Sequence, residues 1–282
     1  MMIVGAYVGF SKLLVAVFPV FLLAWLRFGI AAVAMATWLK AGRNAQPLDT
    51  RTRYLVFLES FLGNFLFSIC MLFGMLHATA ISAGVVMAGI PAEVALLSRA
   101  FLKERLSVRM LIAIALGVAG ISVLAVSRGG HDEGATSLLG TLLLVGAVFC
   151  EASYVVIGKR LTGQLSPKRI SALINLWGLL LVTPFGMYAA WSFDFAAVSA
   201  NIWGGLVLYA LAASMWTVWL WMTGLKTVPA AKAGVFTVFL PVTSALVGVI
   251  FLGEAFTVAH GMAFACAMAG VLLATWPTTA ST

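Results

Sequence analysis

Six ionisable side chains lie well inside long apolar runs of this sequence, where a charge is costly. They are Lys12, Arg27, Glu59, His77, Glu93 and Glu151. A charge in a lipid-like interior must face the protein or a wet cavity, because lipid solvates it poorly. One interpretation is that these groups pair and hold helices together. The other is that they bind a substrate that carries charges of both signs.

Glu93 lies near the middle of the apolar run 80–102, two residues after Pro91. Ser82, Val86 and Gly89 precede it at helical spacing and would share its face of a helix. A face of small and polar residues suits the wall of a cavity. We therefore predict that Glu93 and Ser82 contact substrate, and that Glu93 is a candidate proton carrier.

Glu151 lies in a second run of small residues, GAVFCEASYVVIGK. Helical spacing places four residues of this run on one face, together with Gly140, which precedes the run. The four are Ala147, Glu151, Tyr154 and Gly158. The pattern predicts that Glu151 and Tyr154 face a cavity. A carboxylate there could hold the ammonium group of a substrate or exchange a proton.

An amino acid zwitterion would also need a basic group for its carboxylate. Lys12 is the candidate, unless its amine extends to the membrane surface. Arg27 is interpreted instead as a structural partner of other helices.

Aromatic and amide side chains are also predicted to contact substrate. Trp216 is predicted to stack on an aromatic or cationic substrate, together with Tyr209, which lies about two helical turns before it. The remaining predicted contacts are Tyr7, Asn64 and Asn175, although a mid-helix asparagine often only bonds a neighbouring helix.

These residues must be positioned by membrane-spanning helices. The chain has 282 residues, of which 63% are hydrophobic and 9% are charged, and its mean hydropathy is +1.09. A soluble domain usually carries about 25% charged residues. Runs of about 20 apolar residues predict an all-α membrane protein with ten spans. The predicted spans are 1–18, 19–39, 54–77, 80–102, 110–126, 138–158, 170–191, 202–225, 230–252 and 258–276.

The basic residues predict the orientation of these spans. Most of the 17 lysines and arginines fall in alternate loops, after the second, fourth, sixth and eighth spans. The positive-inside rule makes those loops cytoplasmic, so both termini are predicted to be cytoplasmic in the plasma (inner) membrane of a bacterium. The same clustering argues against nucleic acid as a partner.

The two halves of the chain repeat one another at an offset of about 150 residues. GIPAEVALLSRAFLKERLSV aligns without a gap on FLPVTSALVGVIFLGEAFTV, so Pro91 meets Pro241 and Glu104 meets Glu254. Five spans in each half is an odd number, so the second repeat must cross the membrane in the opposite sense. We predict two inverted repeats, 1–127 and 137–276, with hinges or static kinks at Pro91 and Pro241.

Several other classes of protein are disfavoured. The three histidines are scattered, no H-E-x-x-H or Walker A pattern occurs, and Cys70, Cys150 and Cys266 lack metal-like spacing. Neither an enzyme, a metal site nor a cofactor is predicted. A channel is disfavoured because no Gly-rich filter segment is present. The expected partners are a small-molecule substrate and membrane lipid, with a monomer as the expected state and a dimer as the alternative.

The ten-span pattern resembles the drug/metabolite transporter superfamily, EamA type. The resemblance rests on Pro19 and Arg27 at the start of the second span and on two L-x-E motifs, at Leu102–Glu104 and Leu252–Glu254. It covers nearly the whole chain and is nearest to aromatic amino acid exporters of the YddG type. It implies an exporter of small metabolites, aromatic amino acids first, that works by alternating access through a central cavity. Proton-coupled multidrug efflux, and transport of nucleotide-linked or lipid-linked sugars, remain alternatives.

Overall fold

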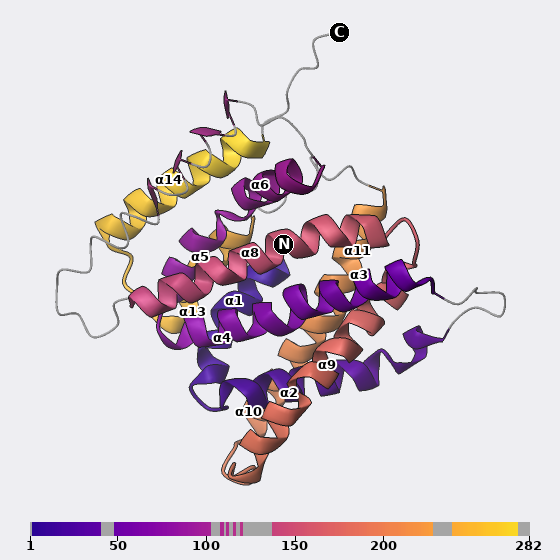
Figure 1. The fold of residues 1–282 in the computed structure, drawn as a ribbon. Helices are drawn as coiled ribbons and strands as arrows, with labels where there is room; N and C mark the ends of the chain where they lie inside the picture. The colour runs from indigo at the N-terminus through magenta and orange to yellow at the C-terminus, as the bar shows by residue number, and fades with distance from the viewer. Residues whose placement is uncertain are drawn as a thin grey trace.

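Every regular element in the part of the chain that this computed structural model describes is a helix, and Figure 1 shows these helices packed side by side. The described residues are 2–40, 48–102, 108–109, 111–112, 115–116, 119–120, 137–227 and 239–275. No strand occurs among them. The prediction of an all-helical fold is therefore confirmed for this part of the chain, whereas most of the predicted span 110–126 lies outside it.

The first half begins with two helices that are shorter than their predicted spans. Its elements are α1 (Met2–Val15), α2 (Val20–Ala34), a 3-10 turn (Ala36–Leu39), α3 (Thr50–Ser60), a π-helical segment (Phe61–Leu66), α4 (Phe67–Leu76), α5 (Ala80–Met87) and α6 (Ile90–Leu102). The segments from α3 to α4 follow one another without a break, so together they form one long apolar helix, Thr50–Leu76.

The second half contains the longest single helices. Its elements are α8 (Leu138–Leu161), α9 (Pro167–Trp191), α10 (Ala200–Ala210), a π-helical segment (Leu211–Trp216), α11 (Thr217–Thr227), α13 (Phe239–Leu252) and α14 (Val258–Thr275). Four described helices are long and apolar enough to cross a membrane: Thr50–Leu76, Leu138–Leu161, Pro167–Trp191 and Ala200–Thr227. The chain is thus a multi-pass helical protein, and the count of ten spans stays a prediction.

Short polar side chains set where several helices begin. Ser137 accepts from the backbone N–H of Gly140 at 3.0 Å, and Asp49 accepts from that of Thr52 at 3.1 Å. Each such side chain satisfies one of the N–H groups that the first helical turn leaves without a partner. These caps help to set the first residues of α3 and α8.

The predicted span 80–102 is not one helix. It is divided into α5 and α6 by a turn at Ala88 and Gly89, where the Gly89 N–H donates to the Val86 carbonyl at 3.0 Å. Pro91 is the second residue of α6, a position at which the missing N–H breaks no helical bond. The proline therefore permits a break instead of bending a continuous helix. Pro241 is the third residue of α13, and the residues 228–238 before it lie outside the described part.

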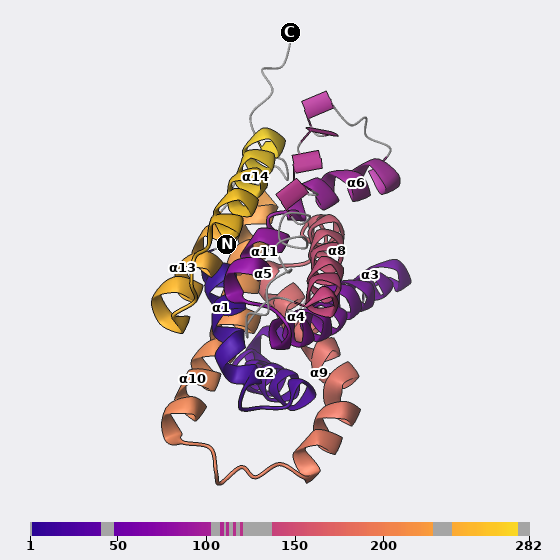
Figure 2. The same cartoon turned by 90° about the vertical axis from the view of Figure 1, so that its left-hand side faces the viewer.

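The two halves are interleaved. α2 packs along α9, α4 along α8, and both α1 and α5 along α13, so each of these contacts joins one half to the other. Figure 2 shows α9 and α10 extending together to one end of the molecule, with the loop between them at its edge. Because each half is packed on helices of the other, a cavity between the halves is lined by both.

Two features recur at the offset of the sequence repeat. The π-helical segments begin at Phe61 and Leu211, which are 150 residues apart (211 − 61). The Lys12 ammonium donates to carbonyls at the end of α4, and that of Lys159 donates to the Leu225 carbonyl near the end of α11 at 2.7 Å. These features of the two halves are thus alike, whereas the two inverted repeats stay a prediction.

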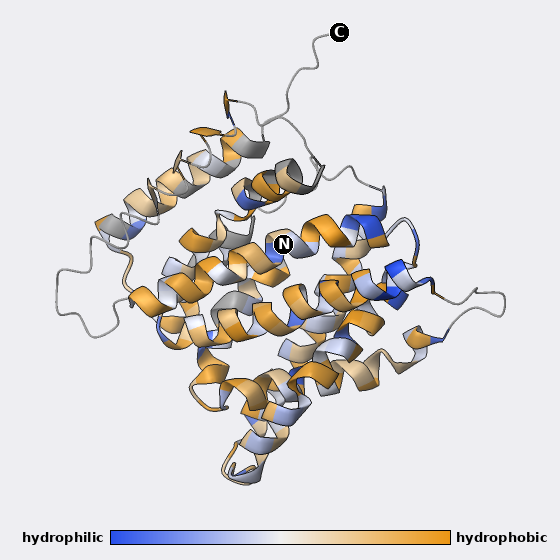
Figure 3. Ribbon diagram, in the orientation of Figure 1, coloured by the Kyte–Doolittle hydropathy of each residue, from blue (hydrophilic) through white to orange (hydrophobic). Residues whose placement is uncertain are grey.

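Polar residues gather at one end of the bundle. Figure 3 shows them where α8 and α11 end and where α3 and α9 begin, whereas the middles of the helices are largely hydrophobic. That end holds Arg51, Arg53, Lys159, Arg160 and Lys168. It is the end that the charge pattern of the loops predicts to be cytoplasmic.

Candidate functional site

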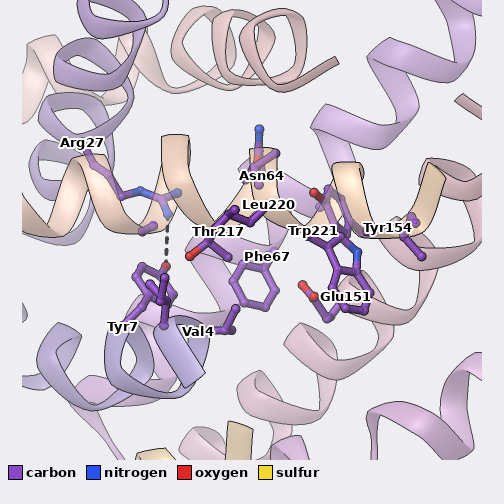
Figure 4. Close-up of a pocket in the computed structure, with 16 residues that line it drawn as sticks. Val4, Tyr7, Arg27, Asn64, Phe67, Glu151, Tyr154, Thr217, Leu220 and Trp221 are labelled. Carbon is purple, nitrogen blue, oxygen red and sulfur yellow. Dashed lines mark hydrogen bonds between the residues drawn. The ribbon is translucent and has the colours of Figure 1, made fainter. Parts of the chain in front are cut away.

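Helices of both halves enclose a cavity of about 300 Å³. Figure 4 shows its side chains converging from α1, α2, the Thr50–Leu76 helix, α8 and α11. The lining residues are Ile3, Val4, Tyr7, Arg27, Gly63, Asn64, Phe67, Glu151, Tyr154, Ala213, Thr217, Val218, Leu220, Trp221, Gly224 and Leu225. Most of these side chains are apolar, with a few polar groups among them, as is usual for a small-molecule site.

Both π-helical segments contribute to the wall of this cavity. Gly63 and Asn64 come from the first segment and Ala213 from the second. A π-helical turn shifts the register of the side chains that follow it, and such turns are frequent at functional sites. A Cβ on Gly63 would lie 2.4 Å from Cδ2 of Tyr154, so the glycine is required for the tyrosine ring to lie against this helix.

Arg27 forms the basic end of the cavity. Its Nη1 donates to the Tyr7 hydroxyl at 3.3 Å, and its Nη2 donates to Ser68 Oγ at 2.5 Å. The guanidinium also lies over the ring of Phe28, 4.3 Å from its centroid. These groups fix Arg27 without neutralising it, because the described residues offer it hydroxyl partners but no carboxylate.

Glu151 forms the acidic end. Figure 4 shows it beside Trp221 and Tyr154, across the cavity from Arg27. No hydrogen bond or ion pair joins Glu151 to another described residue. The Tyr154 hydroxyl, Trp221 Nε1 and Thr217 Oγ1 are buried and also lack a partner among the described residues. Such unsatisfied groups are rare in native interiors, so here they mark a place for a polar ligand or for water.

Glu59 is a further carboxylate behind this end of the cavity. It is fully buried, and neither carboxylate oxygen has a partner among the described residues. A Cβ on Gly158 would lie 2.8 Å from Glu59 Oε1, so the carboxylate contacts α8 one turn beyond Tyr154. Glu59 and Glu151 are close enough to repel one another electrostatically.

The structure brings four of the ten predicted substrate contacts to this cavity: Tyr7, Asn64, Glu151 and Tyr154. Tyr209 lies just behind the lining, because its ring stacks on that of Tyr7 with centroids 4.9 Å apart. The turn at Ala88 and Gly89 explains why Glu93 and Ser82 lie elsewhere. The shared face predicted for them assumed one continuous helix, which the turn interrupts.

The other predicted contacts have structural partners or point away from the cavity. Lys12 donates to the carbonyls of Met75 at 3.1 Å and Ala78 at 2.6 Å. Asn175 donates to the Phe28 carbonyl at 3.0 Å. Trp216 is 39% exposed, and Trp221 supplies the aromatic wall in its place. Arg27 therefore lines the cavity and Lys12 donates to backbone carbonyls of the first half, the reverse of the arrangement that the sequence favours.

Sequence reasoning missed Trp221, Thr217 and the lining role of Arg27. The π-helical segment before Thr217 changes which residues of the helix face inward, and helical spacing alone does not reveal this change. The chemistry of the site is that of ligand binding, with no metal-binding cluster of His, Cys, Asp or Glu anywhere in the described ranges.

The sequence matches known transporters along nearly its whole length. The model of the EamA-like transporter family matches residues 1–126 and 138–276. Uncharacterized transporter YetK of Bacillus subtilis (strain 168) is 34% identical over 275 residues, which cover 97% of this chain and 83% of that protein. An uncharacterized transporter of Archaeoglobus fulgidus is 24% identical over 235 residues, covering 83% of this chain and 81% of its own length.

A crystal structure with similar helix packing supports the fold alone. It superposes with a TM-score of 0.66 at 20% sequence identity, and the match covers 97% of both chains. The helices of this chain therefore follow an arrangement that an experimentally determined protein also adopts.

Proposed function

Since the chain belongs to the EamA-like transporter family, we propose that this membrane transporter exports small zwitterionic amino acids, those with aromatic side chains first. The observation that supports this substrate class is the placement of Arg27 and Glu151 at opposite ends of one cavity. A bound amino acid would direct its carboxylate to the guanidinium and its ammonium group to the carboxylate, since charge-assisted hydrogen bonds are the strongest available there.

The walls between the two charged ends favour a large apolar side chain. Phe67, Leu220 and Trp221 present apolar or aromatic surface to the cavity. An indole or phenyl ring would gain from burial and from stacking on Trp221. A sugar would instead need many hydrogen-bonding groups, so the nucleotide-linked and lipid-linked sugar alternatives fit this lining less well.

The proposed mechanism is alternating access between two inverted repeats, 1–127 and 137–276. The equivalent π-helical segments and the equivalent lysines of the two halves support this symmetry. The turn before Pro91 divides one predicted span into two short helices, and a short helix can tilt on such a turn while its neighbours stay packed. Pro241 is the proposed counterpart in the second repeat.

The proposed orientation places both termini in the cytoplasm of a bacterial cell, with the protein in the plasma membrane. The basic end shown in Figure 3 supports it through the positive-inside rule. In this orientation α1 runs outward from Ile3 to Val15, so the cavity lies between mid-depth and the cytoplasmic side.

Exchange transport by the purified protein in liposomes tests the substrate class. Three related compounds separate the contributions of the two charges: tryptophan, tryptamine without the carboxylate, and indole-3-propionate without the ammonium group. We expect unlabelled tryptophan to drive uptake of labelled tryptophan, and each analogue to compete at least about tenfold less well because one charged end of the cavity then loses its partner. Equal competition by all three compounds would show that the two charged ends do not select the substrate.

A second candidate is export of amphipathic cations. Glu59 favours it, because it adds a second carboxylate at the acidic end of the cavity. This candidate predicts that tryptamine competes better than tryptophan, and that replacing Arg27 leaves tryptamine transport intact.

A further inference from the structure

The link between α4 and α5 is held from two sides by oppositely charged side chains. Lys12 of α1 donates to the carbonyls of Met75 and Ala78, at the C-terminal end of α4. Glu254 accepts from the N–H groups at the start of α5, from Ala80 at 2.8 Å and from Ile81 at 3.0 Å. A cation at a helix C-terminus and an anion at a helix N-terminus both match the helix dipole.

The backbone of the second half aims Glu254 at this place. Gly253 has φ +65° and turns the chain directly after α13. The N–H of Glu254 then donates to the Gly248 carbonyl at 3.0 Å. Residues other than glycine rarely adopt this positive φ, so Gly253 is required for the turn.

The contact is also tightly fitted. A Cβ on Gly248 would lie 2.7 Å from Glu254 Oε2 and 3.1 Å from Ile81 Cγ1. The absence of a side chain at Gly248 therefore lets α13 approach α5 closely enough for the carboxylate to reach both N–H groups. Lys12 attracts the same carboxylate electrostatically, which strengthens the assembly.

This contact joins the two halves, and the route from the cavity past it is closed. Tyr7 lines the cavity, whereas Ser11, Leu14 and Phe18 follow it toward the end of α1 and are all buried. Beyond them, Phe18 packs against Trp203 of α10 with ring centroids 5.5 Å apart. In the proposed orientation this closed route leads to the outside of the cell.

We infer that Glu254 is a latch that holds the outer side of the transporter closed by capping α5 across the boundary between the two halves. This inference rests on the proposed alternating access. When the outer side opens, the two halves must separate there, and the bidentate contact of Glu254 with Ala80 and Ile81 must break. Weakening the latch therefore shifts the protein toward the outward-open state, because a conformational equilibrium follows the contacts that differ between its states.

Cysteine accessibility in vesicles tests the latch without any substrate. Cys70, Cys150 and Cys266 are first replaced by alanine. Single reporters are then introduced as Ser11→Cys, on the closed outer route, and Val4→Cys, in the cavity, and each is labelled with a membrane-impermeant maleimide from the outer or the cytoplasmic side. We expect Glu254→Gln to raise labelling of the Ser11→Cys reporter from outside about tenfold, and to lower labelling of the Val4→Cys reporter from the cytoplasmic side, because a contact with a charged group has been weakened.

Two further variants separate a latch from a general loss of structure. Gly248→Ala keeps the charge but places a methyl group against the carboxylate, and it should shift both reporters in the same directions as Glu254→Gln. Asp194→Asn is the matched control, because Asp194 also accepts from two backbone N–H groups, those of Ala196 and Ala197, but within a single loop. It should change neither reporter.

The inference is overturned if Glu254→Gln leaves the Ser11→Cys reporter unchanged, or if labelling of both reporters rises, since a local loss of packing exposes both sides. A parallel measurement tests the substrate proposal separately. Tryptophan is added to the two reporter proteins that retain Glu254, and the change in maleimide labelling is measured. A response to tryptophan together with no effect of Glu254→Gln rejects the latch alone, whereas the reverse result rejects the substrate alone.

Discussion

The outer link between α4 and α5 and the central cavity both hold buried or partly buried charges, but they treat them differently. At the link, Lys12 and Glu254 each contact two backbone groups of helix ends. In the cavity, Arg27 donates to two hydroxyl groups and lies over the Phe28 ring, and Glu151 makes no hydrogen bond to another described residue. The difference is that the charges at the link are satisfied by the backbone of other helices, whereas Arg27 and Glu151 have no oppositely charged partner among the described residues, as the proposed substrate site requires.

Arg27→Gln is the strongest way to break this comparison. The change removes the positive charge at the basic end of the cavity, so exchange transport of tryptophan should fall about a hundredfold, whereas the lost hydrogen bonds to the Tyr7 and Ser68 hydroxyls should lower the apparent melting temperature by only a few degrees. Uptake into liposomes and the apparent melting temperature of the same preparation measure the two effects. If the variant loses stability but keeps its transport activity, Arg27 holds helices together, as Lys12 does, and does not bind substrate.

Glu151→Gln should have the next largest effect. Loss of the carboxylate should weaken competition by tryptophan about tenfold, because a charge-assisted bond to the ammonium group becomes a neutral one. Competition by indole-3-propionate, which has no ammonium group, should stay unchanged in the same exchange assay. An equal loss for both compounds would indicate a distorted cavity and not a lost ion pair.

Lys12→Gln should show the opposite profile to Arg27→Gln. The change leaves the carbonyls of Met75 and Ala78 without their charged donor, which should cost about 1–3 kcal/mol and lower the apparent melting temperature by several degrees. The concentration of tryptophan that gives half-maximal exchange should not change. A large shift in that concentration would return Lys12 to the substrate site.

Asp49→Asn should have the smallest effect on stability. It extends the comparison to a carboxylate at the surface that is satisfied by a helix end. Hydrogen bonds from Thr52, the side chain first and then the backbone, hold the pKa of the Asp49 carboxyl below its usual 3.8. A depressed pKa in the folded protein means that the carboxylate stabilises the fold at neutral pH, and that this stabilisation disappears as the pH falls through the folded-state pKa. The small difference in melting temperature between the wild type and Asp49→Asn should therefore vanish in acid, and a difference that persists there would have another cause.

The candidate site shows how far pattern alone reaches. Spacing predicts a shared face for Glu151 and Tyr154, and both line the cavity because α8 is a regular helix from Leu138 to Leu161. Helical spacing does not carry across the turn at Ala88 and Gly89, so Glu93 does not line this cavity, and its contact with substrate stays a prediction. Trp221 was missed for a related reason, since a π-helical segment precedes it on its helix.

The sequence by itself determined the class of the protein, because hydropathy and loop charges depend on composition along the chain and not on packing. It also determined that buried charges must be accommodated. Only the tertiary structure decided which charge serves which purpose, since that depends on the partners that other helices bring. Lys12 reaches the carbonyls of α4 and Arg27 reaches the cavity because helices distant in sequence meet there, and residue spacing within one helix carries no information about such meetings.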